Sequence, residues 1–295
     1  MNIEKWLSKN ALRLDGKRVV ISGSTGGLGR ELCNYIAQLG GELVLLDRNS
    51  TRSLALADEL RGRFPQLAVS HITADMSDMA SVRSAADRLS EMNIDYLILN
   101  AGAYSIPRCI CDTGYGNIFQ INFLSPYYLA RRLLPSIEKR SGRIVAVSSI
   151  AHNYSRIDER EVDFASRKGD AKVYGNAKRY LTYSLFALGS PAISVAHPGI
   201  SFTGITNHYP PIIFALIKHP MKIIFPHPRV ACLSILAGLF TDCKTGEWIG
   251  PTLFDIWGSP RKKPLRTASS EEAGRIASIA DQIYSDLEKN IKKQI

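Results

Sequence analysis

The sequence predicts an α/β fold in which a parallel sheet is covered by helices on both faces. Short apolar runs of strand length alternate with segments of helical periodicity from about residue 17 to residue 197. A glycine-dense turn follows the first run, and polar residues stand where several later runs end. Strands separated by helices pair in parallel through right-handed crossovers, so a doubly wound sheet in one domain over residues 1–295 is expected.

The first strand, turn and helix come from the stretch 17–31. Residues 19–22 form a run without alternation, and apolar residues then recur at helical spacing. Between them, Gly23 permits a tight turn, Gly27 leaves room for a pyrophosphate and Gly29 lets helix and strand approach closely. The N–H groups of the helix N-terminus attract an anion. Because glycine turns also close ordinary crossovers, this pattern needs support from the rest of the chain.

The remaining elements continue the alternation. Further strands are expected at about 41–48, 67–75, 94–102, 142–149, 192–199 and 247–258, and helices at about 53–63, 78–92, 115–139, 170–188, 230–240 and 269–292. The part that would bind a cofactor therefore spans about 15–200.

Polar residues mark the ends of the predicted strands. Asp47, Asp75, Asn100 and Ser149 end or follow four strands, and the Pro198-Gly199 pair ends another. Ligands of open α/β sheets bind outside the carboxyl ends of the strands. These positions together predict a dinucleotide site.

The composition is that of an ordinary globular protein. With 45% hydrophobic residues in a chain of 295, one sizeable core is feasible. The net charge of +10 favours anionic partners, but lysines and arginines are scattered rather than interleaved with aromatic residues, so nucleic acid is not expected. The first ten residues contain no apolar run, which argues against a secretory signal and for a cytoplasmic location.

No metal site is expected from the cysteines or the histidines. The five cysteines are an odd count without a C-x-x-C pair, which is typical of reduced thiols. The histidines of the second half of the chain lack a carboxylate or thiolate partner at ligand spacing, so they are interpreted as structural or exposed. His197, at a strand end, is placed beside the cofactor pocket.

The stretch 200–228 interrupts the alternation. It is apolar and proline-rich, and two lysines divide it, so it is too broken to span a bilayer. Two interpretations stay open: an apolar lobe that covers a substrate cleft, which we favour, and an interfacial segment that contacts lipid.

Tyr174 and Lys178 are candidates for acid–base chemistry. They are four residues apart on a predicted helix and so share one face. A phenol titrates near about 10, and a neighbouring ammonium favours the phenolate, so Lys178 would tune Tyr174. Such pairs are common by chance, but this one follows a strand that ends in Ser148 and Ser149.

These motifs in this order resemble the short-chain dehydrogenase/reductase family over about residues 14–258. The resemblance implies a Rossmann-type fold and a catalytic tetrad of Asn122, Ser149, Tyr174 and Lys178. The cofactor-binding residues that it implies are Ser22, Gly23, Thr25, Gly27, Leu28, Gly29, Asp47, Arg48, Asp75, Met76, Asn100, Ala101, Gly102, Tyr174, Lys178, Pro198, Gly199 and Thr203.

The resemblance also implies a role for each member of the tetrad. Tyr174 would exchange a proton with the substrate oxygen, and Ser149 would donate a hydrogen bond to the same oxygen. Lys178 would hold the nicotinamide ribose, and Asn122 would anchor a water that links Lys178 to solvent. The cofactor would carry the hydride.

Three details bear on the branch of the family. Ala177 stands where the family usually has serine. The long insert 155–170 between Ser149 and Tyr174 is similar to the retinol-dehydrogenase-like branch, whose members act on lipophilic alcohols and carbonyls; it either reshapes the cleft mouth or is a surface loop. Gly26 also fits the spacing of the extended branch that includes sugar-nucleotide epimerases, but the chain after Lys178 is short for their second domain.

The choice between NAD and NADP depends on the end of the second strand. Asp47 lies about twenty residues after the glycine turn, where a carboxylate accepts the ribose hydroxyls and repels a 2′-phosphate. NAD is therefore favoured. Arg48, the next residue, would instead clamp the 2′-phosphate of NADP.

The sequence thus predicts an oxidoreductase that moves a hydride between NAD or NADP and a retinoid-, steroid- or long-chain-like substrate. A homodimer or homotetramer is expected from the family. Two alternatives stay open: a catalytically silent protein that senses the dinucleotide, and a membrane-surface protein that uses its basic charge. The first needs only the glycine turn and Asp47, so the complete tetrad argues against it.

Overall fold

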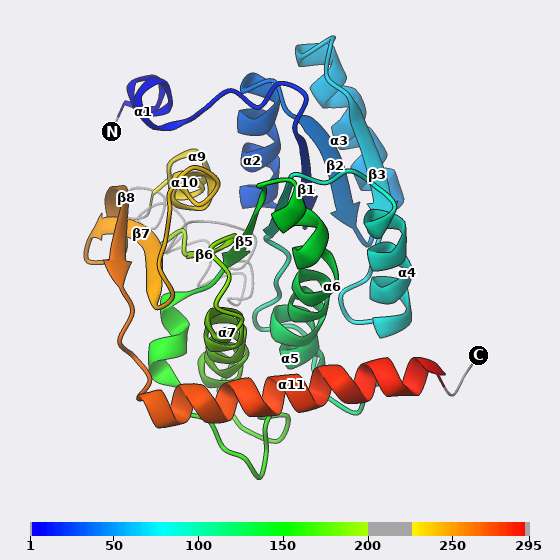
Figure 1. Ribbon diagram of the computed structural model, residues 1–295, viewed down its shortest axis with the longest axis vertical. Helices are drawn as coiled ribbons and strands as arrows, with labels where there is room; N and C mark the ends of the chain where they lie inside the picture. Colours follow the sequence, from blue (N-terminus) through cyan, green and yellow to red (C-terminus); the bar gives the residue numbers. More distant parts are fainter. Residues whose placement is uncertain (1, 200–225, 293–295) are drawn as a thin grey trace, which may run out of the picture.

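An eight-stranded sheet runs through the centre of the protein (Figure 1). The computed structural model describes residues 2–199 and 226–292. The strands follow the order β3-β2-β1-β4-β5-β6-β7-β8, with all pairs parallel except the last. Their bounds are β1 Arg18–Ser22, β2 Glu42–Asp47, β3 Val69–Thr73, β4 Tyr96–Leu99, β5 Arg143–Val147, β6 Ile193–Ala196, β7 Glu247–Leu253 and β8 Trp257–Pro264. The predicted doubly wound α/β class is confirmed.

Helices cover both faces of the sheet, and a separate apolar core lies under each layer. In β1, Val20 faces the core shared with α4, α6, α7 and α11, whereas Val19 and Ile21 face the core shared with α2, α3 and α10. This alternation follows from the two-residue period of a strand. The helices are α1 Ile3–Asn10, α2 Gly27–Gln38, α3 Ser50–Arg63, α4 Met79–Ser90, α5 Asn117–Phe119, η1 Gln120–Leu124, α6 Ser125–Lys139, η2 Ile150–Tyr154, α7 Asp170–Ala187, α9 Pro228–Ala231, α10 Leu233–Ala237 and α11 Ser270–Lys292.

The ligand edge lies where β1 and β4 are neighbours in the sheet. The order of the strands reverses there, because β1 leads outward to β2 and β3 while β4 begins the other half. Ligands of such sheets bind in the crevice at this switch point. The carboxyl ends of β1, β2 and β4 therefore meet where the sequence analysis expects a dinucleotide.

Three predicted elements differ from the structure. One helix was expected over 115–139. The structure has α5, one turn of π-helix (η1) and α6 in succession there, because the backbone around Asn122 is wound more widely than in an α-helix. The strand expected over 247–258 is a hairpin of β7 and β8, which turns at Phe254 and Asp255, both with positive φ. The helix expected over 230–240 is divided into α9 and α10.

The C-terminal helix α11 runs past α7 and α6 (Figure 1). Its apolar side joins the core through Ile276, Ala280 and Ile283. An ion pair between Arg131 of α6 and Asp281 adds a contact at the surface. The last helix thus packs against the helix that carries Tyr174.

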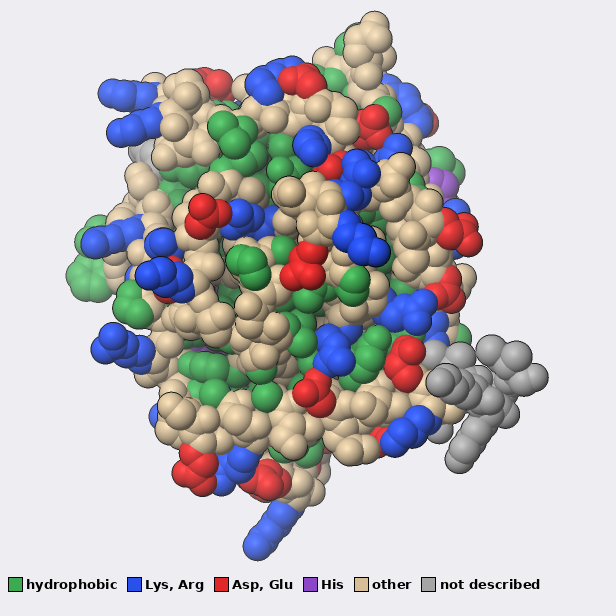
Figure 2. Space-filling model, viewed as in Figure 1, with side chains coloured by type: hydrophobic (Ala, Val, Ile, Leu, Met, Phe, Trp, Pro, Cys, Tyr) green, Lys and Arg blue, Asp and Glu red, His purple; other side chains and the backbone are tan. Residues whose placement is uncertain are grey.

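Charged side chains of both signs are interspersed on the face shown in Figure 2. A mixed surface of this kind does not form the basic stripe typical of a nucleic-acid interface. Within residues 2–199 and 226–292, none of the helices has the length and apolar character that crossing a bilayer requires.

Candidate active site

The glycine turn between β1 and α2 is packed against the end of β4. Gly23 has a φ of +67°, and a Cβ there would lie 2.9 Å from the Cα of Ala101. The side-chain Nδ2 of Asn100 donates to the carbonyls of Ser22 and Gly23, both at 3.0 Å. Asn100 therefore holds the turn in place rather than serving as a loose surface amide.

A cavity of about 380 Å³ opens above this turn. Its lining includes the first turn of α2, whose N–H groups have no partner within the helix. It continues past the ends of β2 and β4, so an anionic group on the glycines and two flanking nucleosides fit its shape. The expected residues that line it are Gly23, Thr25, Gly27, Leu28, Gly29, Asp47, Arg48, Asp75, Met76, Asn100, Ala101 and Gly102.

Some expected residues lie elsewhere, and some lining residues were missed. The hydroxyl of Ser22 accepts from the N–H groups of Asn100 and Ala101 at 3.0 Å, so it joins two strands beneath the cavity. Thr203 lies outside the described residues, as does the lobe 200–228 up to residue 225. The lining residues that were missed are Gly26, Leu46, Asn49, Arg52, Ala74, Ala103, Tyr104, Ile106 and Ile121, most of them direct neighbours of the expected residues.

The carboxylate of Asp47 is held by hydrogen bonds from neighbouring protein groups. It accepts hydrogen bonds from the hydroxyls of Ser24, Thr25 and Ser53 and from the N–H of Thr25. A carboxylate has about four acceptor positions, so these donors occupy most of its capacity, with the Ser53 hydroxyl shared with the carbonyl of Asn49. Asp47 is 6% exposed. Asp47 lines the cavity, and the expectation that it accepts ribose hydroxyls stays a prediction, although protein donors already bond its oxygens.

Asn122 and Lys178 meet beside Gly102. A Cβ on Gly102 would lie 2.8 Å from Oδ1 of Asn122 and 3.6 Å from Nζ of Lys178. Asn122 donates to the carbonyls of Ala103 and Ile118 at 2.7 and 2.8 Å, which fixes it in the π-turn. Nζ of Lys178 donates to the carbonyl of Val147 at 2.8 Å, and burial lowers the pKa of this amine to about 7.

Tyr174, Ser149 and Lys178 lie close together. Tyr174 is hydrogen bonded to Ser149, and Nζ of Lys178 is 5.6 Å from the Tyr174 ring centroid. Burial raises the pKa of Tyr174 to about 12, while the hydrogen bond from Ser149 lowers it. Tyr104 packs edge-on against the Tyr174 ring with centroids 5.3 Å apart. The structure thus brings together the three groups that the sequence placed in a tetrad.

A buried histidine is hydrogen bonded to the turn after β6. Gly199 has a φ of +76°, and its N–H donates to Nδ1 of His197 at 3.2 Å. Nε2 of His197 therefore carries the proton and donates to Asp255 at 3.1 Å. The ring stacks on Trp248 and is fully buried, and burial lowers its pKa. His197 thus braces the Pro198-Gly199 turn and does not line the cavity.

The insert 155–170 packs on the helices around Tyr174. Phe164 forms a small apolar cluster with Ile118 and Val173, next to Tyr174. Asp163 accepts from the N–H of Gly116 at 2.6 Å, which joins the insert to α5. Of the two interpretations left open by the sequence, these contacts favour a wall of the site over a loose surface loop.

The geometry agrees with comparisons to known proteins. Residues 17–159 match the family model described as short chain dehydrogenase. The chain belongs to the short-chain dehydrogenase/reductase family. Retinol dehydrogenase 13 of Homo sapiens is 26% identical over 285 residues, which cover 89% of this chain and 82% of that protein. Retinol dehydrogenase 12 of Mus musculus is 30% identical over 207 residues, which cover 67% and 65%.

A solved structure of a protein from Mycobacterium paratuberculosis superimposes with a TM-score of 0.71. The two sequences are 24% identical, and the superposition covers 93% of this chain and 96% of the other chain, which supports the fold. This short-chain dehydrogenase/reductase falls in the retinol-dehydrogenase-like branch. It is an NAD(P)-dependent oxidoreductase that acts on CH–OH or carbonyl groups. In the described part of the chain, no three His, Cys, Asp or Glu side chains gather as metal ligands would.

Proposed function

We propose that the enzyme interconverts an alcohol and a carbonyl on a lipophilic substrate, with Tyr174 as general acid and base. The observation that carries this proposal is the Tyr174–Ser149 hydrogen bond beside Lys178, adjacent to Gly102 and Tyr104 of the cavity lining. A bound nicotinamide cofactor would supply or accept the hydride. The residues of this chain then supply alignment and the proton.

The protonation state of Tyr174 favours carbonyl reduction. Burial raises its pKa to about 12, so the phenol carries its proton at neutral pH and can donate it to a carbonyl oxygen. Ser149 provides a second donor to the same oxygen, which stabilises the charge that develops on it. Lys178, with its pKa lowered to about 7, takes up or releases protons near neutrality and can restore the proton of Tyr174 through solvent.

Apolar residues around Tyr174 support a lipophilic substrate. Ile106 packs next to Tyr174 in the same cluster as Phe164 and Val173, and Tyr104 covers the edge of the ring. Two relatives are named as retinol dehydrogenases, which is consistent with retinoid-, steroid- or long-chain-like carbonyls. The apolar lobe remains a prediction because it lies almost wholly outside the described residues.

The assay that tests this proposal follows NADPH or NADH oxidation with all-trans-retinal, decanal and a 3-ketosteroid, alongside short polar ketones. We expect turnover with at least one lipophilic carbonyl, and a kcat/KM at least about tenfold above that of the polar ketones. Tight cofactor binding without turnover on any carbonyl would instead support the silent sensor. A preference for polar ketones would remove the lipophilic substrate class.

We infer that the cofactor is NADP(H) rather than the NAD(H) favoured by the sequence. The oxygens of Asp47 accept hydrogen bonds from Ser24, Thr25 and Ser53, so few acceptor positions remain for a ribose diol. Arg48 and Arg52 are exposed and line the cavity beside it. Guanidinium groups bind phosphate bidentately, which favours a cofactor with a 2′-phosphate.

Replacing both Arg48 and Arg52 with serine will test the cofactor preference. We expect kcat/KM for NADPH to fall at least about tenfold, because charge-assisted hydrogen bonds to the 2′-phosphate are lost. Turnover with NADH should change less than about twofold. Equal losses for both cofactors, or a wild-type preference for NADH, would contradict the inference. Peripheral membrane contact, a cytoplasmic location and a dimer or tetramer remain predictions.

A further inference from the structure

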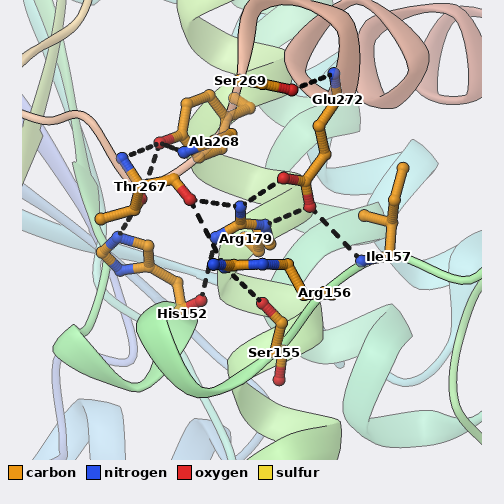
Figure 3. A network of polar contacts seen from close by, with 10 residues as sticks. His152, Ser155, Arg156, Ile157, Arg179, Thr267, Ala268, Ser269 and Glu272 are labelled. Atoms are coloured by element: carbon orange, nitrogen blue, oxygen red, sulfur yellow. Dashed lines mark hydrogen bonds and ion pairs between the residues drawn. The ribbon is translucent and has the colours of Figure 1, made fainter.

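A buried ion pair joins α7, the helix that carries Tyr174 and Lys178, to the C-terminal helix α11 (Figure 3). Arg179, the residue after Lys178 on α7, is fully buried, and its Nε and Nη2 donate to the two carboxylate oxygens of Glu272 at 2.8 and 2.7 Å. Nη2 also donates to the carbonyl of Thr267 at 2.6 Å, and Nη1 to the carbonyl of His152 at 3.2 Å. One guanidinium therefore connects α7, η2 and the start of α11.

The hydrogen bonds of His152 have a fixed direction. Its Nδ1 lies against the carbonyl of Ser149, which can only accept, so Nδ1 carries the proton. Nε2 then accepts from the hydroxyl of Thr267 at 3.0 Å. Since Thr267 gives its one proton to His152, the hydroxyl of Tyr183 donates to Thr267 at 2.7 Å. Burial lowers the pKa of His152 to about 4, so this neutral tautomer persists at neutral pH.

This network ends on the backbone of Ser149. The Ser149 carbonyl accepts from Nδ1 and, at 3.2 Å, from the N–H of His152. The short helix η2 that follows lies directly on α7, because a Cβ on Gly175 would be 2.3 Å from the carbonyl of Ala151. A change in the position of η2 would therefore carry the Ser149 hydroxyl away from its partner Tyr174.

We propose that His152, Arg179 and Glu272 are positioning residues that hold the Ser149 hydroxyl against Tyr174. The proposal rests on the proposed function of that tyrosine. Apolar residues of similar size would fill the space of a buried ion pair at little or no cost in stability. The planar guanidinium, in contrast, fixes acceptors from three segments at once. Through it, the start of α11 is connected to the segment that carries Ser149.

The side chain of His152 is tested by a pair of substitutions. His152→Asn keeps an N–H donor near the place of Nδ1, whereas His152→Leu removes it. We expect kcat for reduction of all-trans-retinal or decanal with NADPH to fall at least about tenfold in H152L, since a small misplacement of a reacting group is costly. KM for NADPH should stay within about twofold, and H152N should recover most of kcat.

The ion pair is tested by the double substitution Arg179→Leu with Glu272→Leu, which leaves no unpaired buried charge. We expect a modest fall in the thermal midpoint, because the carbonyls of His152 and Thr267 lose a donor, while kcat falls at least about tenfold. The matched control replaces Glu271 and Arg275, an exposed pair on the same helix, with alanine, and should leave kcat unchanged.

Hydrogen exchange of residues 149–154, measured without substrate, separates this proposal from the proposed function. We expect faster exchange in H152L and in the double variant than in H152N and the surface control. Unchanged exchange and unchanged kcat in both altered proteins would overturn the positioning role. Absence of turnover in the wild type would overturn the proposed function, whatever the exchange shows.

Discussion

Replacing Tyr174 with phenylalanine is expected to lower kcat by about three orders of magnitude while cofactor affinity stays unchanged. The substitution removes one oxygen, and with it the proton donor that the Ser149 hydrogen bond aligns. A positioned general acid contributes about 10²- to 10⁴-fold to the rate. The ring remains to pack against Tyr104, so the fold is preserved. Steady-state kinetics and NADPH fluorescence titration measure the two quantities separately.

Tyr180, six residues further along α7, provides the matched control. Its hydroxyl is buried and, within the described residues, has no hydrogen-bond partner. Tyr180→Phe deletes the same atom from the same helix, so kcat should be retained and stability should rise slightly, because an unsatisfied buried hydroxyl is removed. If Y174F kept most of its turnover, Tyr174 would have no part in proton transfer.

The sequence predicted the sheet and the position of the site because both depend on local patterns. Apolar runs at regular intervals specify parallel strands, and parallel strands bring their carboxyl ends to one edge. The strand β8 was missed because its residues are mostly exposed and include three consecutive charges, Arg261, Lys262 and Lys263, as suits an antiparallel edge strand. The π-turn at Asn122 was missed because one extra residue per turn barely alters a helical pattern.

The direction of a side chain depended on partners distant in the chain. Asp47 was correctly placed at the end of β2, but the hydroxyls of Ser24 and Ser53 donate to its carboxylate. Arg179 gave no signal, because its partner Glu272 lies 93 residues later. Sequence position therefore predicted which residues lie at the carboxyl ends of the strands. Hydrogen bonds between distant parts of the chain determine what each of these residues contacts.

Gly29→Ala is expected to destabilise the protein by about 2–3 kcal/mol and to weaken NADPH binding at least about tenfold. A Cβ at Gly29 would lie 2.2 Å from the carbonyl oxygen of Gly23 and 2.7 Å from the Cα of Ser24. Both neighbours are backbone atoms of the turn that borders the cavity, so they cannot move aside without displacing the N–H groups that we expect to bind phosphate. Urea unfolding and fluorescence titration measure the two effects.

Gly26→Ala in the same turn distinguishes this close approach from a general need for glycine. Its nearest contact would be the carbonyl oxygen of Gly23 at 3.4 Å, and its φ of −80° suits any residue, so less than about 0.5 kcal/mol should be lost. Gly62→Ala, in an open position of α3, should add about 0.5–1 kcal/mol. Equal losses at positions 26 and 29 would contradict the steric argument. A difference between them would show that the approach of α2 to its own turn requires glycine at 29, and that the extended-branch spacing through Gly26 is incidental.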